Sequence, residues 1–143
     1  MLPITFSVLG EPKSQPRVKA MRMGGFIKIY TPATAKVWKG LVAKAARPFL
    51  PSVPFTEALT LTVEFTFTRP KSHFTSKGEI RPAAPRFHTK KPDTDNLVKA
   101  VMDQLTDSGL WHDDAQITYL RVLKRYAKKD EAEGCRVSVE EGV

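Results

Sequence analysis

Residues 59–68 read Leu-Thr-Leu-Thr-Val-Glu-Phe-Thr-Phe-Thr, an unbroken alternation of apolar and polar side chains. Successive side chains of a β-strand point to opposite faces, so this pattern predicts a strand with one buried face. Shorter apolar alternations follow the same period at 4–8, at 116–126 and at 135–140, and each predicts a further strand. A short strand is also expected at 26–30, after the Gly24-Gly25 turn.

Two other segments carry a helical period. After residue 31, apolar side chains recur at three- and four-residue spacing. The members of this face are Trp38, Leu41, Val42, Ala45 and Phe49. We expect this helix to be capped by Thr31, to have Pro32 at its first position and to end near Pro48. A second helix is expected at 94–107 and should stop at Gly109.

Strands and helices in this order predict a mixed α/β, or α+β, fold. We expect two helices to cover a mixed sheet, in a single domain over residues 1–143. Cys135 lies in the alternating run 135–140 and should be a buried thiol in a reducing cytoplasm. No apolar run approaches the roughly 18 residues of a membrane span, and no signal peptide is evident, so no membrane partner is expected.

The net charge of +8 is unevenly distributed. Residues 1–92 hold 16 Lys and Arg against 4 Asp and Glu, whereas residues 93–143 hold 7 against 11. A basic front followed by an acidic cluster indicates a protein that holds a polyanion with one part and processes it with another. A merely soluble basic domain is the simpler alternative.

The acidic cluster begins at the start of the second helix, with Asp93 and Asp95 one residue apart. One of them could simply cap the helix, as Thr94 also could. A second carboxylate adds repulsion that a cation would offset. Mg²⁺ takes few carboxylates and shares its other positions with water and phosphate oxygens. The pair therefore predicts a magnesium site that faces a phosphodiester.

A second acidic pair, Asp113 and Asp114, follows the helix, and the next strand could bring it beside the first pair. Lys99 lies four residues after Asp95 and four before Asp103, so these three share a helix face. They could form a surface ion-pair ladder, or Lys99 could hold the scissile phosphate. His112 is the other candidate nearby, as a general base or as an ordinary turn residue.

Residues 69–92 form a proline-rich loop with seven Lys and Arg against one Glu. Phosphate contact is the simplest role for such cations, here and in the N-terminal segment. Phe74 and Phe87 could stack on unpaired bases, or could anchor the loop to the core. The candidate DNA-binding residues are Lys13, Arg17, Lys19, Lys71, Lys77, Arg81, Arg86, Lys90 and Lys91.

Residues 91–99, Lys-Pro-Asp-Thr-Asp-Asn-Leu-Val-Lys, followed by Asp113-Asp114-Ala115-Gln116, resemble the signature of the RusA-type Holliday junction resolvases. The resemblance is specific over 91–117 and looser at Gly10, Pro12, Pro16 and Arg17. It places the catalytic carboxylates on Asp93, Asp95 and Asp114 and the essential lysine on Lys99. It also places a further acidic position on Asp113, a fourth candidate metal ligand.

The resemblance implies a crossover junction endodeoxyribonuclease that depends on Mg²⁺, for which Mn²⁺ can substitute, and that uses metal-activated water. It implies a homodimer that makes paired nicks in four-way DNA junctions during recombination and repair. No nucleotide cofactor is expected, and a bacterial or phage source is. Two alternatives remain open: a metal nuclease directed at flaps or single strands, and a non-enzymatic basic DNA-binding module.

Overall fold

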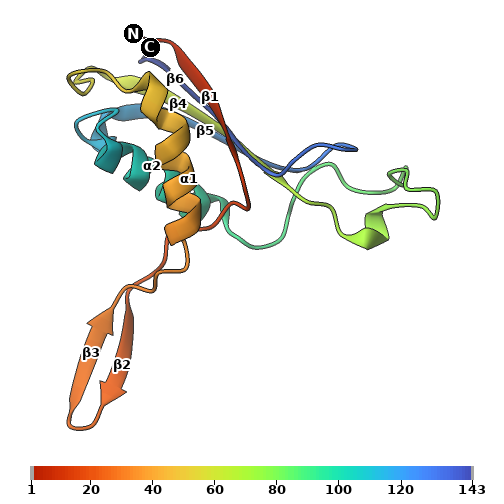
Figure 1. Cartoon of the computed structure of the whole chain (residues 1–143), viewed down its shortest axis with the longest axis horizontal. Coiled ribbons are helices and arrows are strands. Elements are labelled where there is room, and N and C mark those ends of the chain that lie inside the picture. Colours follow the sequence, from red (N-terminus) through yellow and green to blue (C-terminus); the bar gives the residue numbers. More distant parts are fainter. Residues whose placement is uncertain (1, 143) are drawn as a thin grey trace.

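The computed structural model describes residues 2–142 and contains two helices, a four-stranded sheet and a separate two-stranded hairpin (Figure 1). The strands are β1 (Ile4–Leu9), β2 (Lys19–Met23), β3 (Phe26–Tyr30), β4 (Leu59–Phe67), β5 (Ile117–Tyr126) and β6 (Gly134–Glu141). The helices are α1 (Lys36–Ala46) and α2 (Thr94–Ser108). Short 3-10 turns occur at Arg47–Phe49, Lys71–His73 and Asp114–Gln116. The predicted fold class, an α+β domain with two helices on a mixed sheet, is confirmed.

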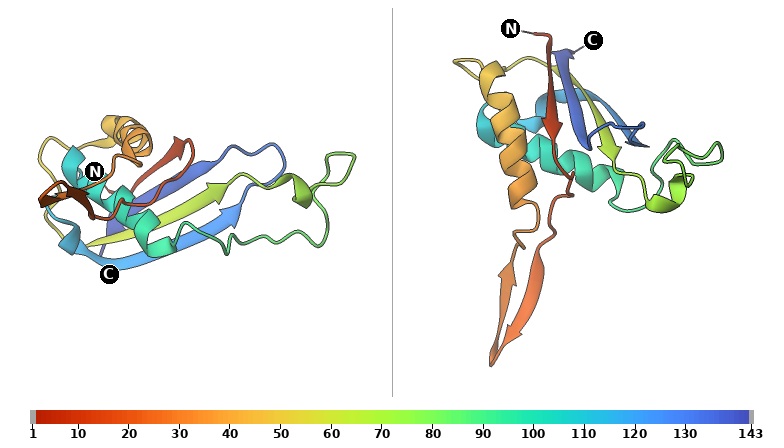
Figure 2. Two further views of the ribbon diagram at one scale, coloured as in Figure 1. Left: turned by 90° about the horizontal axis from the view of Figure 1, so that it is seen from below. Right: turned by 45° about the vertical axis from the view of Figure 1, so that its right-hand side comes forward.

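The strand order in the large sheet is β1-β6-β4-β5. β6 runs antiparallel to both of its neighbours, whereas β4 and β5 are parallel. A parallel pair needs a crossover connection, and α2 supplies it here. Because β5 leaves α2 and runs alongside β4, the end of α2 and the start of β5 lie at the same edge of the domain (Figure 2).

The core lies between one sheet face and the two helices. Alternate residues of β4 are fully buried, as its sequence pattern predicted. α1 contacts β1 and α2 contacts β5, and the two helices also pack against each other. The helices contribute Trp38, Val42, Leu97, Val101 and Leu105 to this core. Cys135 is buried in it as expected, and burial raises the pKa of its thiol to about 12.

In the N-terminal half, the predicted start of the first helix is wrong, and one strand is present that was not predicted. α1 begins at Lys36 and not at Pro32, because Thr31 and Pro32 still belong to the exit from β3. Ala35 occupies the N-cap position and provides no side-chain hydrogen bond. The expected strand 26–30 is present, but it pairs with a second strand, β2, that was not predicted. We call residues 18–30 the arm, because this hairpin projects from the body of the domain (Figures 1 and 2).

Candidate active site on the first turn of α2

The first turn of α2 carries Asp93 and Asp95 with unequal environments. Asp93 occupies the N-cap position, yet its side chain makes no capping hydrogen bond. The capping explanation for this residue is therefore wrong. Asp93 lines a surface hollow with Arg17 and Lys91, whereas Asp95 lines a different one on the side of β5.

The hollow on the β5 side is lined by three of the predicted residues. Asp95, Lys99 and Asp114 line it, and the apolar side chains of Leu120 and Val122 lie beside them. The ion-pair ladder is not formed: among residues 2–142, no ion pair within 4.0 Å involves Lys99. Its ammonium instead lies close enough to Asp114 to affect the pKa of that carboxylate.

Asp114 is a candidate carboxylate whose pKa departs from the ordinary value. Burial, followed by the neighbouring carboxylates of Asp113 and Asp103, raises its pKa, and Lys99 opposes that rise. Unneutralised negative charge is therefore concentrated at this point. Among residues 2–142, however, no three Asp, Glu, His or Cys side chains are arranged closely enough to enclose a metal ion. Asp95 and Asp114 line one hollow, from the first turn of α2 and from the loop after the helix, whereas Asp93 lines the other.

Asp113, the fourth candidate metal ligand, forms a capping box with Gln116. Its Oδ1 accepts a hydrogen bond from the backbone N–H of Ala115 (2.8 Å), and its own N–H donates to Gln116 Oε1 (2.7 Å). Gln116 Nε2 donates in turn to the carbonyl oxygens of Phe55 and Glu57, just before β4. These bonds fix the loop that carries Asp114 beside α2. His112 is exposed in this loop, and its backbone N–H donates to the Phe55 carbonyl.

Asn96 has a comparable structural role on the other side of α2. Its carbonyl oxygen accepts a hydrogen bond from the N–H of Gln15 (2.9 Å). With the side-chain amide turned so that its oxygen faces Arg17, that oxygen accepts from Nη2 at 3.1 Å and from Nε at 3.3 Å. The N-terminal loop is thereby held against the first turn of α2, and Arg17 lies beside Asp93.

Lys124 is a site residue that the sequence pattern did not reveal. It lies on β5, half-buried under the segment that leads into α2. Its Nζ donates hydrogen bonds to the carbonyl oxygens of Lys90 (2.7 Å) and Pro92 (2.6 Å). Burial lowers the pKa of Lys124, and the nearby Asp93 opposes that effect. The residue therefore positions the chain that presents Asp93.

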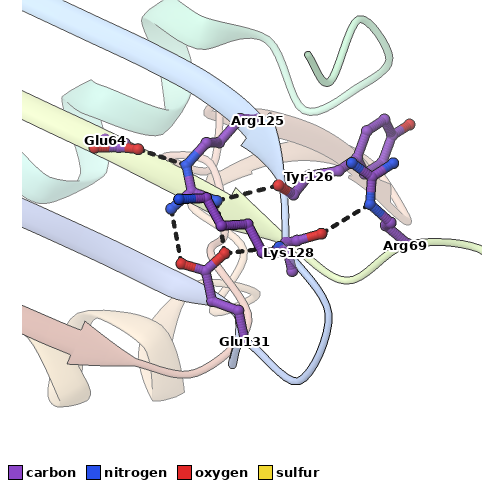
Figure 3. A network of polar contacts seen from close by, with 7 residues as sticks. Glu64, Arg69, Arg125, Tyr126, Lys128 and Glu131 are labelled. Carbon is purple, nitrogen blue, oxygen red and sulfur yellow. Dashed lines mark hydrogen bonds and ion pairs between the residues drawn. The ribbon is translucent and has the colours of Figure 1, made fainter. Parts of the chain in front are cut away.

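The basic loop 69–92 is anchored at its ends by an aromatic cluster around Tyr126. The ring of His88 stacks on Phe67 at 4.2 Å, and His73 meets Tyr126 edge-on at 4.8 Å. Arg69 lies over the Tyr126 ring and donates to the Ala127 carbonyl (2.8 Å), as Figure 3 shows. A further ion pair, from Lys129 to Glu79 at 2.7 Å, ties the middle of the loop to the turn before β6, and the lysines of the loop are exposed.

Arg125 fixes the neighbouring turn from the other sheet face. It donates to Glu64 (2.5 Å) and, through two nitrogens, to Glu131 (2.6 and 2.8 Å) (Figure 3). The hydrogen bonds from Arg125 lower the pKa of Glu131 to about 2. The side chain of Arg125 is only 12% exposed, whereas those of Glu64 and Glu131 are 35% and 32% exposed, so only the guanidinium end of these ion pairs is shielded from water.

The predicted DNA-binding residues fall into two groups. Lys13 and Arg17 lie in the N-terminal segment leading into the arm and Lys19 lies at the start of the arm, and the other six lie in the basic loop. Arg17 and Lys91 share the hollow with Asp93. Some of the others have partners within the chain: Lys13 pairs with Glu11, and Arg81 donates to the Ser72 carbonyl. Phe87 is exposed, with the Arg86 guanidinium over its ring at 5.0 Å, and Phe74 is half-buried and pairs with Ile80.

No helix in residues 2–142 is long and apolar enough to cross a membrane.

Comparison with known proteins agrees with the geometry. The family model described as endodeoxyribonuclease RusA matches residues 10–140. The Bacillus subtilis protein YqaN is 33% identical over 138 residues, which cover 91% of this chain and 92% of that protein. The crossover junction endodeoxyribonuclease RusA of Escherichia coli K12 is 51% identical over 35 residues, 24% of this chain and 29% of that protein, and its phage 82 counterpart matches to the same extent. A match across nearly the whole chain shows that this protein belongs to the RusA endodeoxyribonuclease family.

Proposed function

We propose that this protein is a Mg²⁺-dependent endonuclease that resolves four-way DNA junctions by paired nicks. The observation that carries the proposal is the hollow beside α2, which Asp95, Asp114 and Lys99 all line, on a chain of the RusA family. Cations of the basic loop and the N-terminal segment flank this acidic site, which suits a substrate that is itself a polyanion.

The donor set fits a hard divalent cation. Mg²⁺ keeps several of its waters and takes only one or two protein carboxylates, and Asp95 with Asp114 meets that requirement. Burial, and after it the carboxylates of Asp113 and Asp103, raises the pKa of Asp114, and a bound cation would favour the ionised form of this carboxylate. Mg²⁺, or Mn²⁺ in its place, supplies at such a site a water of lowered pKa and neutralises phosphate charge.

The residues of the chain have distinct tasks in this proposal. Asp95 and Asp114 would hold the cation. Asp93 would contribute its carboxylate from the opposite side of the first turn of α2. Lys99 binds a phosphate oxygen and stabilises the negative charge that develops on it, because no carboxylate within 4.0 Å occupies its ammonium among residues 2–142. Asp113, Asn96 and Gln116 keep these groups in place through their backbone contacts.

The proposal includes a homodimer. One site makes one nick, and resolution of a four-way junction requires two nicks in strands of like polarity. The junction has two-fold symmetry, so a two-fold dimer would present one site to each of the two strands.

The test is cleavage of a synthetic four-way junction and of a linear duplex of the same arm sequence, with Mg²⁺, Mn²⁺, Ca²⁺ or EDTA. We expect symmetric paired cuts in the junction alone, with Mg²⁺ or Mn²⁺, and binding with little turnover in Ca²⁺. Full activity in EDTA would exclude the metal mechanism. Preference for a flap or single strand would indicate a different nuclease, and tight binding without any cleavage would indicate a DNA-binding module.

A further inference from the structure

The arm exposes more apolar surface than any other part of the domain. Every residue of β2 is exposed, and so is every residue of β3 except Tyr30. The large apolar side chains left in water here are Val18, Met21, Met23, Phe26, Ile27 and Ile29. Ile29 is 71% exposed and Ile27 is 64% exposed. Figure 2 shows the hairpin standing clear of the helices and the sheet.

The pairing register separates these side chains onto two faces. Ala20 pairs with Ile29 and Arg22 with Ile27, and Val18 continues the same side of β2. We call Val18, Ala20, Ile27 and Ile29 the aliphatic face. The opposite face carries Lys19, Met21, Met23, Phe26 and Lys28. Two of the arm's three cations therefore point away from the aliphatic face, and Arg22, near the tip, is the exception.

A two-stranded hairpin with this surface is not stable by itself. An isolated hairpin is at best marginally stable in water, and three strands or a packed layer are needed to hold it. Soluble monomers rarely leave a contiguous aliphatic patch of this kind uncovered. A permanent protein partner on the aliphatic face accounts for both facts.

A hollow of about 460 Å³ lies at the root of the arm. Its lining residues are Gln15, Pro16, Thr31, Pro32, Ala33, Ala35, Lys36, Lys39, Gly40, Ala43 and Gln104. Its lining has several small residues, and a Cβ added at Gly40 would meet nothing within 4 Å. The hollow can therefore accept large apolar side chains, which are what the tip of the arm carries.

We propose that the arms of two copies of this chain pack antiparallel across a two-fold axis, aliphatic face against aliphatic face. Each tip then reaches the hollow at the root of the other arm. The proposal deepens the dimer of the proposed function and rests on it for the need for a second copy. The arm and the hollow together offer about two dozen residues, and one side of a standard interface has roughly 20–30.

Two observations favour a second copy over DNA on this face. Val and Ile side chains have no π-face to stack on bases, and most of the arm's cations point to the other side. The root of the arm is also continuous with the candidate site: Val18 and Thr31 line one hollow together with Asn96 and Lys99. Pairing the arms would therefore fix the position of one acidic site relative to the other.

The first experiment compares the two faces of the same arm by sedimentation equilibrium at micromolar protein, without DNA or metal. Ile27→Thr/Ile29→Thr removes the aliphatic face, and Met21→Thr is the control on the other face, away from the tip that would enter the hollow. Thr keeps a high β-propensity in both variants. We expect a dimer of twice 16.0 kDa for the unmodified chain and for the control, and at least tenfold weaker association for the Ile variant.

The second experiment fills the hollow without touching the arm. Gly40→Leu places a side chain in open space on a helix, so the fold should be kept or slightly stabilised, whereas dimerisation should weaken by at least tenfold. Gly40→Ala is the small control and should leave the dimer intact. Circular dichroism and a thermal melt confirm that each variant is folded.

A chain that stays monomeric at these concentrations, or a dimer that survives both Ile27→Thr/Ile29→Thr and Gly40→Leu, would overturn the proposal. Loss of junction binding by the Ile variant with its dimer unchanged would assign the aliphatic face to DNA. Failure of the nuclease proposal looks different: the arms would still pair, but no junction would be cut.

Discussion

Lys124 donates a hydrogen bond of 2.6 Å from its ammonium group to the carbonyl oxygen of Pro92, the residue directly before Asp93. The same ammonium binds the Lys90 carbonyl at 2.7 Å. One side chain of the sheet thus determines how the chain enters the helix that carries the acidic site.

We expect Lys124→Met to slow junction cleavage by roughly ten- to hundredfold, because a small displacement of a reacting group has an effect of that size. Junction affinity should change by less than twofold. The free energy of unfolding should fall by about 2 kcal/mol, since two carbonyls lose a charged donor. Lys124→Arg should restore part of the rate. Equal rates for the Met variant and the parent, measured well below the melting temperature, would remove this positioning role.

Replacement by Asn should have different effects on junction cleavage at the adjacent residues Asp113 and Asp114. Asp114→Asn should abolish cleavage and leave junction binding intact or tighter, because it deletes a proposed ligand and a negative charge facing DNA. Asp113→Asn keeps a capping oxygen and should retain most activity, whereas Asp113→Ala should cost about 1 kcal/mol of stability. Single-turnover kinetics in Mg²⁺ with parallel binding measurements would decide, and inactivity of Asp113→Asn would make that residue a ligand too.

The pH dependence of cleavage should reflect Asp114. Burial and the carboxylates of Asp113 and Asp103 raise its pKa, and a cation binds the ionised form only. Activity is therefore lost on acidification at a higher pH than an ordinary Asp would give. Asp103→Asn removes one of the raising charges, so the acid limb of the kcat/KM profile should move to lower pH. A shift to higher pH would contradict this electrostatic assignment.

Substitutions in the basic loop should affect DNA binding, whereas substitution of Lys99 should affect the chemical step. Changing Lys71 and Lys77 to Gln should weaken junction binding and reduce the slope of log affinity against log salt by roughly 0.9 for each phosphate that is no longer neutralised. Lys99→Ala should slow the chemical step with little change in that slope. A nearly silent, well-folded Lys99→Ala variant would restrict Lys99 to a surface role.

Arg125→Met should reduce the free energy of unfolding by about 2 kcal/mol at pH 7, because Glu64 and Glu131 lose their charged donor. The Glu131 pKa, held at about 2, lies below the ordinary 4.5. Its contribution is therefore present above pH 4.5 and lost as the pH falls toward 2. Urea titrations at several pH values should show the two proteins converging on acidification. A difference that stays constant with pH would exclude the Glu131 contribution.

The sequence predicted the large sheet well because strand periodicity is a local property. The alternation in β4 is complete, and its buried face is the predicted one. β2 was missed because Lys-Ala-Met-Arg-Met has no buried face to impose an alternation. The start of α1 was misplaced because Thr31 and Pro32 suit a helix start, yet here they lead the chain out of the arm.

The site was predicted from its residue types, but its division of labour was not. The spacing of the acidic pairs predicted that the second pair returns beside the first, and in the structure Asp95 and Asp114 line one hollow beside α2 and β5. It could not show that Asp113 caps a turn or that Asn96 holds Arg17, because those contacts depend on side-chain direction. Lys124 was missed because it lies far along the chain from the two carbonyls that it binds, and only the sheet register brings it to them.

The order of strands in the large sheet has a consequence for how the domain folds. β6 lies between β1 and β4, and its Val139 is the register partner of both Ile4 and Leu61. During synthesis, β1 emerges first and has no neighbour in the sheet until β6 follows near the other end of the chain. Such non-local pairing slows folding, and it leaves the edges of β1 and β4 open to other chains meanwhile. Expression at lower temperature should therefore raise the yield of folded protein more than a stabilising substitution does.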